Sequence, residues 1–174
     1  MSADVQHVFR EYIRLDRKRQ GEALSIAEHE RWAVLKRRLN VHFQPDLPSH
    51  HADARGSVRV PVRLALHFER FDELGGSLMT NLSRGGLFIA TTSPLPIGER
   101  LLLDVVVDDG GRTGPVVAFR ARAEVASHDT GADLQGRRRG MGVRFVDVDE
   151  VQRKAIDDLY ERAAAHAVGI RPRR

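Results

Sequence analysis

The stretch VRVPVRLALHF, residues 58–68, places a valine, leucine or phenylalanine at every second position. Mainly arginine, proline and histidine stand between them. Such alternation predicts a β-strand with one buried face, because successive side chains of a strand point to opposite faces of the sheet. Pro61 has no backbone N–H and favours an edge strand or the start of a strand.

Five further apolar runs follow, at residues 78–82, 87–90, 101–107, 116–125 and 141–146. They are separated by turn signals rich in glycine, proline and aspartate at residues 75–76, 94–98, 108–114 and 131–140. No helical pattern lies between the runs, which favours an antiparallel barrel or sandwich over parallel βαβ units. After Asp149, a candidate N-cap, apolar residues at helical spacing predict a closing helix that could cover one end of a barrel.

The N-terminal region, residues 4–39, predicts two helices. The first is expected to end at Gly21, and Ser25 with Glu28 forms a capping-box pattern at the start of the second. Each helix carries an apolar stripe, formed by Val5, Val8, Phe9, Tyr12 and Leu15 and by Trp32, Leu35 and Leu39. Two short helices bury little surface alone, so the pair either packs internally as an antiparallel hairpin or forms a dimer or partner surface.

Composition limits the class of protein. A chain of 174 residues holds one main domain, and the absence of cysteine excludes disulfides and thiolate metal sites. No segment resembles a signal peptide or a membrane helix, so a soluble cytoplasmic protein is expected. The formal net charge is +4, and all but three of the 28 basic residues are arginine. Arginine favours phosphate and flat bases, although GC-rich codon usage gives the same bias.

Two short motifs could carry chemistry. In NLSRGG, residues 81–86, a turn with a positive φ explains a glycine but not the polar pair Asn81 and Ser83. In RGSVR, residues 55–59, two guanidinium groups could close over an anion, each offering paired donors to phosphate or guanine. By itself, an RxxxR spacing in an arginine-rich chain is commonly a solvated surface pair.

Together these motifs resemble the RxxxR and (D/N)xSxxG signature of PilZ domains, and GMGVRF at residues 140–145 resembles the last strand of that family. The resemblance covers residues 52 to about 165. It implies a six-stranded antiparallel β-barrel that binds the bacterial messenger cyclic di-GMP (c-di-GMP). Arg55 and Arg59 would grip phosphate and guanine, Asn81 and Ser83 would hydrogen-bond the ligand, and Gly86 would let the backbone turn close beside it.

The chain also departs from the family pattern. Ala54 stands where many members carry another arginine, so one or two bound ligand molecules remain open. Arg84 and Arg144 could add charge to the pocket or be surface residues at a strand edge. His50 and His51 are adjacent and unsuited to hold one metal together, so no metal site is expected.

The predicted fold is therefore a mainly β, PilZ-type barrel with a C-terminal helix, preceded by an α-helical hairpin. The expected division is residues 1–43 for the hairpin, 44–54 for a linker, 55–167 for the barrel with its closing helix and 168–174 for a basic tail.

The predicted function is a non-catalytic c-di-GMP receptor. Ligand binding would change the conformation of the RxxxR linker and signal to an effector protein, and the hairpin could form a homodimer. The alternatives are a ligand-independent adaptor and a nucleic-acid-binding barrel. The second is disfavoured because the only Trp lies on the N-terminal helices and there are two Tyr. No nucleophile, base or metal constellation indicates an enzyme, and no cofactor is expected.

Overall fold

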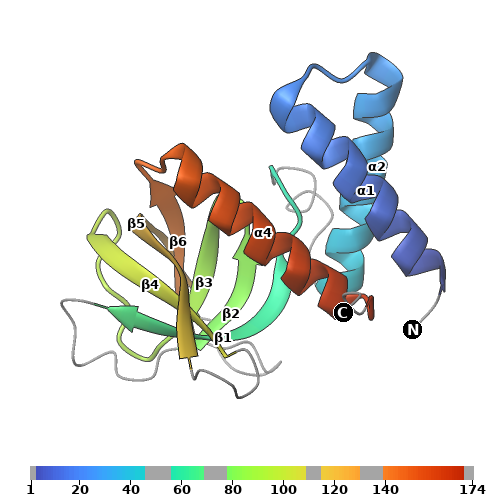
Figure 1. Cartoon of the computed structure of the whole chain (residues 1–174). Coiled ribbons are helices and arrows are strands. Elements are labelled where there is room, and N and C mark those ends of the chain that lie inside the picture. Colours follow the sequence, from blue (N-terminus) through green and yellow to red (C-terminus); the bar gives the residue numbers. More distant parts are fainter. Residues whose placement is uncertain (1–2, 46–55, 69–77, 109–114, 130–138, 171–174) are drawn as a thin grey trace. The chain divides into compact units, whose positions relative to one another are not determined.

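The computed structural model describes residues 3–45, 56–68, 78–108, 115–129 and 139–170 (Figure 1). The predicted turn at residues 75–76 and most of the predicted loops at 108–114 and 131–140 lie outside these ranges. The chain divides into two compact units, a helical unit of residues 1–60 with 161–174 and a barrel unit of residues 61–160. No helix in the described ranges is long and apolar enough to cross a membrane.

The barrel unit confirms the predicted fold class. Its six strands form a closed barrel in the order β1-β2-β3-β6-β5-β4, and β4 pairs with β1 to close it (Figure 1). The pairs β2–β3, β3–β6, β4–β5 and β5–β6 are all antiparallel. The strands are β1 (Val60–Phe68), β2 (Leu78–Ser83), β3 (Gly86–Ala90), β4 (Arg100–Asp108), β5 (Pro115–Asp129) and β6 (Gly140–Val146).

Apolar residues of β2 to β6 fill the part of the barrel interior that the structure describes. Pro61 is the second residue of β1, at the strand start that its missing N–H favours. The turn predicted at residues 94–98 places Gly98 at a φ of 87°, where a side chain would be strained. The fully buried core residues include Met79, Leu82, Ile89, Leu103, Ala121, Ala123, Val125 and Met141.

The closing helix is α4 (Glu150–Ala167). Asp149 precedes it, and its Oδ1 accepts a hydrogen bond from the Gln152 N–H at 2.7 Å, as expected of an N-cap. The Gln152 side chain donates to the backbone oxygen of Arg120 in β5, at 2.9 Å. Ile156, Leu159 and Tyr160 are buried. The end of α4, from residue 161 onward, belongs to the helical unit.

The helical unit contains α1 (Ala3–Gly21) and α2 (Ile26–Phe43). The predicted first helix end at Gly21 and both hydrogen bonds of the Ser25–Glu28 capping box are confirmed. The two predicted stripes meet in a core that includes Val8, Phe9, Tyr12, Leu15, Trp32, Leu35 and Leu39, all buried. The predicted end of the hairpin at residue 43 and the predicted end of the linker at residue 54 stay predictions.

The capping box also joins the two helices. The Glu28 carboxylate accepts hydrogen bonds from Lys18 Nζ at 2.7 and 3.0 Å and from the Ser25 N–H at 2.9 Å. These bonds lower the pKa of Glu28 from 4.5 to about 2. The hydrogen bond from Lys18 is the largest cause, and the bond from the Ser25 N–H is the second.

A Glu28→Gln variant tests this bond. A carboxylate whose pKa is depressed in the folded state stabilises the fold above its unfolded pKa, and this contribution is lost as the pH falls from 4.5 toward about 2. We therefore expect the free energy of unfolding of the wild type to fall more steeply over this range than that of the variant, as measured by urea titrations at several pH values. A Glu30→Gln variant of the same helix should keep the wild-type slope; equal slopes for the wild type and Glu28→Gln would contradict the prediction.

Candidate functional site

NLSRGG forms the β2–β3 hairpin. Ser83 pairs with Gly86, and the Ser83 hydroxyl donates a hydrogen bond to the Gly86 carbonyl oxygen at 2.9 Å, so Arg84 and Gly85 form the turn. Among the described residues, positive φ values of glycine occur at Gly98 and Gly169 and not at Gly85 or Gly86. The expectation that a glycine here supplies a positive φ is therefore wrong.

Asn81 and Ser83 lie on one face of β2, on either side of the fully buried Leu82. Because side chains alternate along a strand, both point to the outside of the barrel, and both are half-buried. A register shift between Met79 and Asn81 makes this arrangement possible. Without it, Asn81 would share the inner face with Met79, since a bulge reverses the alternation by one residue. The sequence pattern contained no signal for this bulge.

Gly86 is required by the close approach of two backbones. A Cβ built at this position would lie 2.1 Å from the carbonyl oxygen of Val143 in β6. Gly140 has the same constraint, since its Cβ would lie 2.0 Å from the Ile89 carbonyl oxygen. The structure thus provides a packing reason for Gly86, whereas its predicted place beside a ligand stays a prediction.

The barrel register places a row of polar residues beside the hairpin. Ser83 of β2 pairs with Gly86 of β3, which pairs with Arg144 of β6, which pairs with Glu124 of β5. Arg144 is exposed and donates to Glu124 Oε1 at 2.7 Å. Because Gly86 has no side chain, the outer barrel surface between Ser83 and Arg144 consists of backbone atoms. We call the outer surface formed by Asn81, Ser83, Gly86 and Arg144 the hairpin face.

Arg84 is directed elsewhere. Its guanidinium forms an ion pair with Asp157 of α4 and lies 4.9 Å from the ring centroid of Tyr160. Only 10% of the Arg84 side chain is exposed. The structure therefore brings Asn81, Ser83, Gly86 and Arg144 together and holds Arg84 against α4.

Arg59 belongs to the helical unit. Its side chain is exposed, and no ion pair of its guanidinium is found within the described ranges. Partial burial nevertheless lowers its pKa by desolvating the charged form. An accessible guanidinium offers paired donors to an anion such as a phosphate. Ala54, Arg55, His50 and His51 lie outside the described residues.

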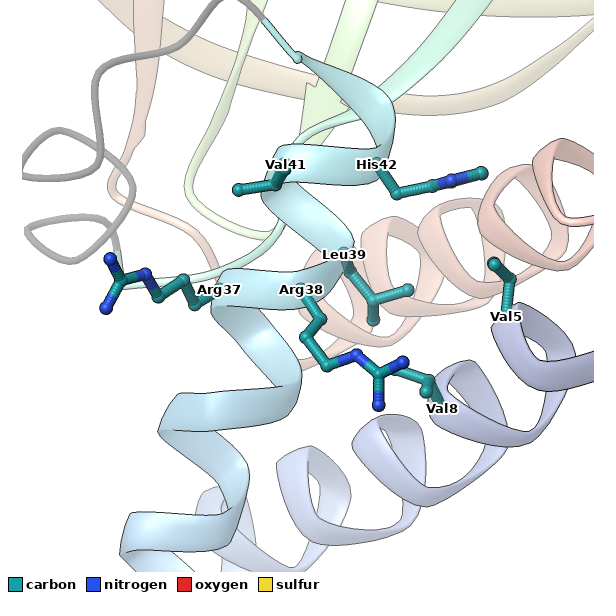
Figure 2. Close-up of a pocket in the computed structure, with 7 residues that line it drawn as sticks. All are labelled: Val5, Val8, Arg37, Arg38, Leu39, Val41 and His42. Atoms are coloured by element: carbon teal, nitrogen blue, oxygen red, sulfur yellow. The ribbon is translucent and has the colours of Figure 1, made fainter.

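The helical unit also contains a pocket of about 390 Å³ between α1 and the end of α2. Figure 2 shows the side chains around it, with those of Arg37 and Arg38 extending from α2. Arg38 is paired with Asp4 of α1 at 2.8 Å. The lining residues are Val5, Val8, Arg37, Arg38, Leu39, Val41 and His42.

A family model described as the PilZ domain matches residues 50–162 of this sequence. The chain belongs to the PilZ domain family. The match includes the RxxxR and NxSxxG motifs and ends within α4, so α1 and α2 lie outside the PilZ domain.

Solved structures are similar to the chain at low sequence identity. The Bacillus subtilis inhibitor of motility, MotI/DgrA, matches at 20% identity with a TM-score of 0.48, over 62% of this chain and 50% of the MotI chain. The PilZ domain with c-di-GMP of YcgR from Escherichia coli matches at 19% identity with a TM-score of 0.46, over 66% of this chain and 97% of that domain. The chain thus spans about half the length of the MotI structure. No curated protein sequence matches it significantly.

Neither short motif pointed to the polar residues buried in the helical unit, which are Asp16, Lys36 and Asn40 among the described residues. Asp16 and Asn40 are adjacent in sequence to the apolar residues Leu15 and Leu39. In an amphipathic pattern, a polar residue beside an apolar one is usually at the boundary of the buried stripe. Their burial depends on what packs against the helices, and a periodicity does not report this.

Proposed function

We propose that this PilZ protein is a non-catalytic receptor for c-di-GMP. Family membership over residues 50–162 is the observation that carries the proposal, because both signature motifs fall within the match. The ligand has two phosphates and two guanines, so it needs forked cations together with neutral donors and acceptors.

The described residues support distinct roles in that recognition. Asn81 offers an amide on the outside of the barrel, and no hydrogen bond of this side chain is found within the described ranges. The Ser83 hydroxyl donates to Gly86 and keeps its oxygen lone pairs for a ligand N–H. Arg59 supplies a guanidinium without a described carboxylate partner, and Arg55 is proposed as the second cation. Arg144 is an accessory cation beside Gly86. Since Ala54 replaces an arginine, one ligand molecule per chain is the proposed stoichiometry.

Binding, rather than chemistry, is the proposed activity. The response to c-di-GMP is a change in the RxxxR segment that reaches a protein partner through the helices. Hydrogen exchange of residues 45–60 should therefore differ between the free and the saturated protein; identical exchange would exclude this signalling step while leaving the receptor role intact.

Titration calorimetry of the full chain with c-di-GMP and with GTP tests the receptor role. The wild type is expected to bind c-di-GMP in preference to GTP. An Asn81→Ala variant should bind c-di-GMP about three- to tenfold more weakly, because a neutral hydrogen bond contributes about 1 kcal/mol. Its thermal unfolding should be close to that of the wild type, since the side chain is half-buried. Ser93→Ala, an exposed change in the β3–β4 loop, is the matched control and should bind as the wild type does.

A ligand-independent adaptor is the second candidate, and the pocket of the helical unit favours it. The apolar side chains of Val5, Val8 and Val41 line this pocket and would suit a partner segment that carries an apolar side chain. A folded wild type that binds no c-di-GMP at high concentration would reject the receptor role and favour this adaptor.

A further inference from the structure

Among the described residues, the buried polar or charged side chains are Asp16, Lys36 and Asn40, and all three belong to α1 or α2. Burying such groups costs free energy unless they form hydrogen bonds, so a concentration of them in one place calls for partners. One such partner, the Arg59 N–H that Asn40 binds, belongs to residues 56–59, the described part of the RxxxR segment.

Three side chains of the helix pair bind the backbone of this segment. The Tyr12 hydroxyl accepts a hydrogen bond from the Val58 N–H at 3.3 Å. Asn40 Oδ1 accepts from the Arg59 N–H at 3.3 Å, and Arg19 Nη2 donates to the Gly56 carbonyl oxygen at 3.3 Å. Neither Tyr12 nor Asn40 is exposed to solvent.

A second layer of side chains orients Arg19. Asp16 accepts a hydrogen bond from Trp32 Nε1 at 2.9 Å and pairs with Arg19 at 3.4 Å. The guanidinium of Arg19 lies 4.4 Å and the Lys36 ammonium 4.8 Å from the centroid of the Trp32 ring. Connected polar networks of this kind favour a single geometry, because each member restricts the next.

The same segment is anchored by its apolar side chains. Val58 and Val60 are 1% and 0% exposed, whereas Arg59 between them is exposed. Alternation in an extended segment therefore directs Arg59 away from the buried valines. The backbone of Arg59 is held while its guanidinium remains accessible.

We infer that the helix pair is a positioning element for the RxxxR segment, with Tyr12, Arg19 and Asn40 as the positioning residues. This inference rests on the proposed c-di-GMP site. The glycine at position 56 gives the segment freedom that would have to be lost on binding, and holding its backbone in advance removes part of that entropic cost. The helices thereby increase affinity for a ligand bearing phosphates, and ligand binding in turn stabilises their hold on the segment.

The test is c-di-GMP titration of the full chain, carried out on Tyr12→Phe, Asn40→Ala and the double variant. Each single change removes one hydrogen bond to the segment and should weaken binding about three- to tenfold at unchanged stoichiometry. Amide exchange at residues 58 and 59 of the ligand-free protein should become faster, while α1 and α2 keep their protection. Glu11→Gln is the matched control. It weakens the ion pair between Glu11 of α1 and Arg31 of α2, whose Oε2 and Nη2 atoms are 2.6 Å apart, and this pair does not contact the segment.

The outcomes separate the two proposals. Faster exchange at residues 58 and 59 with unchanged affinity would overturn the positioning role and leave the receptor role standing. Tighter binding by the variants would also overturn it, because the helices would then oppose the bound conformation. Absence of binding by the wild type would overturn both proposals. Weaker binding by Tyr12→Phe and Asn40→Ala, with Glu11→Gln like the wild type, would support positioning.

Discussion

An Arg59→Ala variant is expected to bind c-di-GMP about 100-fold more weakly than the wild type. Hydrogen bonds to charged groups contribute about 1.5–3 kcal/mol each, and a guanidinium can form two with one phosphate or guanine edge. Tenfold in affinity corresponds to about 1.4 kcal/mol, so the loss of a forked contact reaches this range. Calorimetry with the full chain measures the effect directly.

The fold should tolerate this substitution. The Arg59 side chain is exposed, and the hydrogen bond to Asn40 comes from the Arg59 backbone, which alanine retains. Thermal unfolding should therefore remain close to that of the wild type. Arg153→Ala, at an exposed arginine of α4, removes an equal charge elsewhere and should leave binding unchanged. Affinity within threefold of the wild type for Arg59→Ala would contradict the proposed role of this arginine.

The second large effect is expected from Gly86→Ala, and it concerns stability. An added Cβ would lie 2.1 Å from the Val143 carbonyl oxygen and 3.0 Å from the Arg144 Cα. Both are backbone atoms, so no side chain can rotate to make room and β3 must separate from β6. We expect the free energy of unfolding to fall by about 2 kcal/mol, in the range of overpacking substitutions.

Thermal and urea unfolding measure this loss, which corresponds to roughly 4–8 °C in melting temperature for a chain of this size. Gly85→Ala is a closely matched control, because it changes the neighbouring glycine. Its Cβ would meet no atom within 4 Å, and its φ is not in the positive range. Gly85→Ala should be neutral or slightly stabilising. Equal destabilisation by both variants would show that the turn, rather than the β3–β6 contact, requires glycine.

Comparing Gly86→Ala with Asn81→Ala also separates a structural from a ligand-binding requirement for the NLSRGG motif. If Gly86→Ala loses c-di-GMP binding together with stability, the glycine is required for the β3–β6 contact, and its effect on ligand binding is a consequence of that contact. Asn81→Ala changes a side chain on the same strand pair without crowding the backbone. A loss of affinity there, with normal unfolding, would assign the ligand contact to the polar residues of NLSRGG.

Local patterns in the sequence were sufficient for the elements and the fold class. Period-two alternation from Val58 to Phe68 predicted β1, and turn signals separated the remaining strands. The Ser25–Glu28 spacing predicted a helix start to the residue, because a capping box depends on groups only three positions apart. The RxxxR and NxSxxG motifs indicated the family, which the match over residues 50–162 confirmed.

The surroundings of individual site residues required the folded chain. The shift between Met79 and Asn81 that turns Asn81 outward arises from the pairing of β2 with β3, and the need for Gly86 arises from β6, more than fifty residues later. The sequence left Arg84 as either an accessory cation or a surface residue at a strand edge, and its ion pair with Asp157 depends on the position of α4. Hydrogen bonds from residues 58 and 59 to Tyr12 and Asn40 connect positions 46 and 19 residues apart. Periodicity and motifs report short separations along the chain, whereas a backbone clash, an ion pair between distant elements or a hydrogen-bonded segment depends on which distant residues the fold brings together.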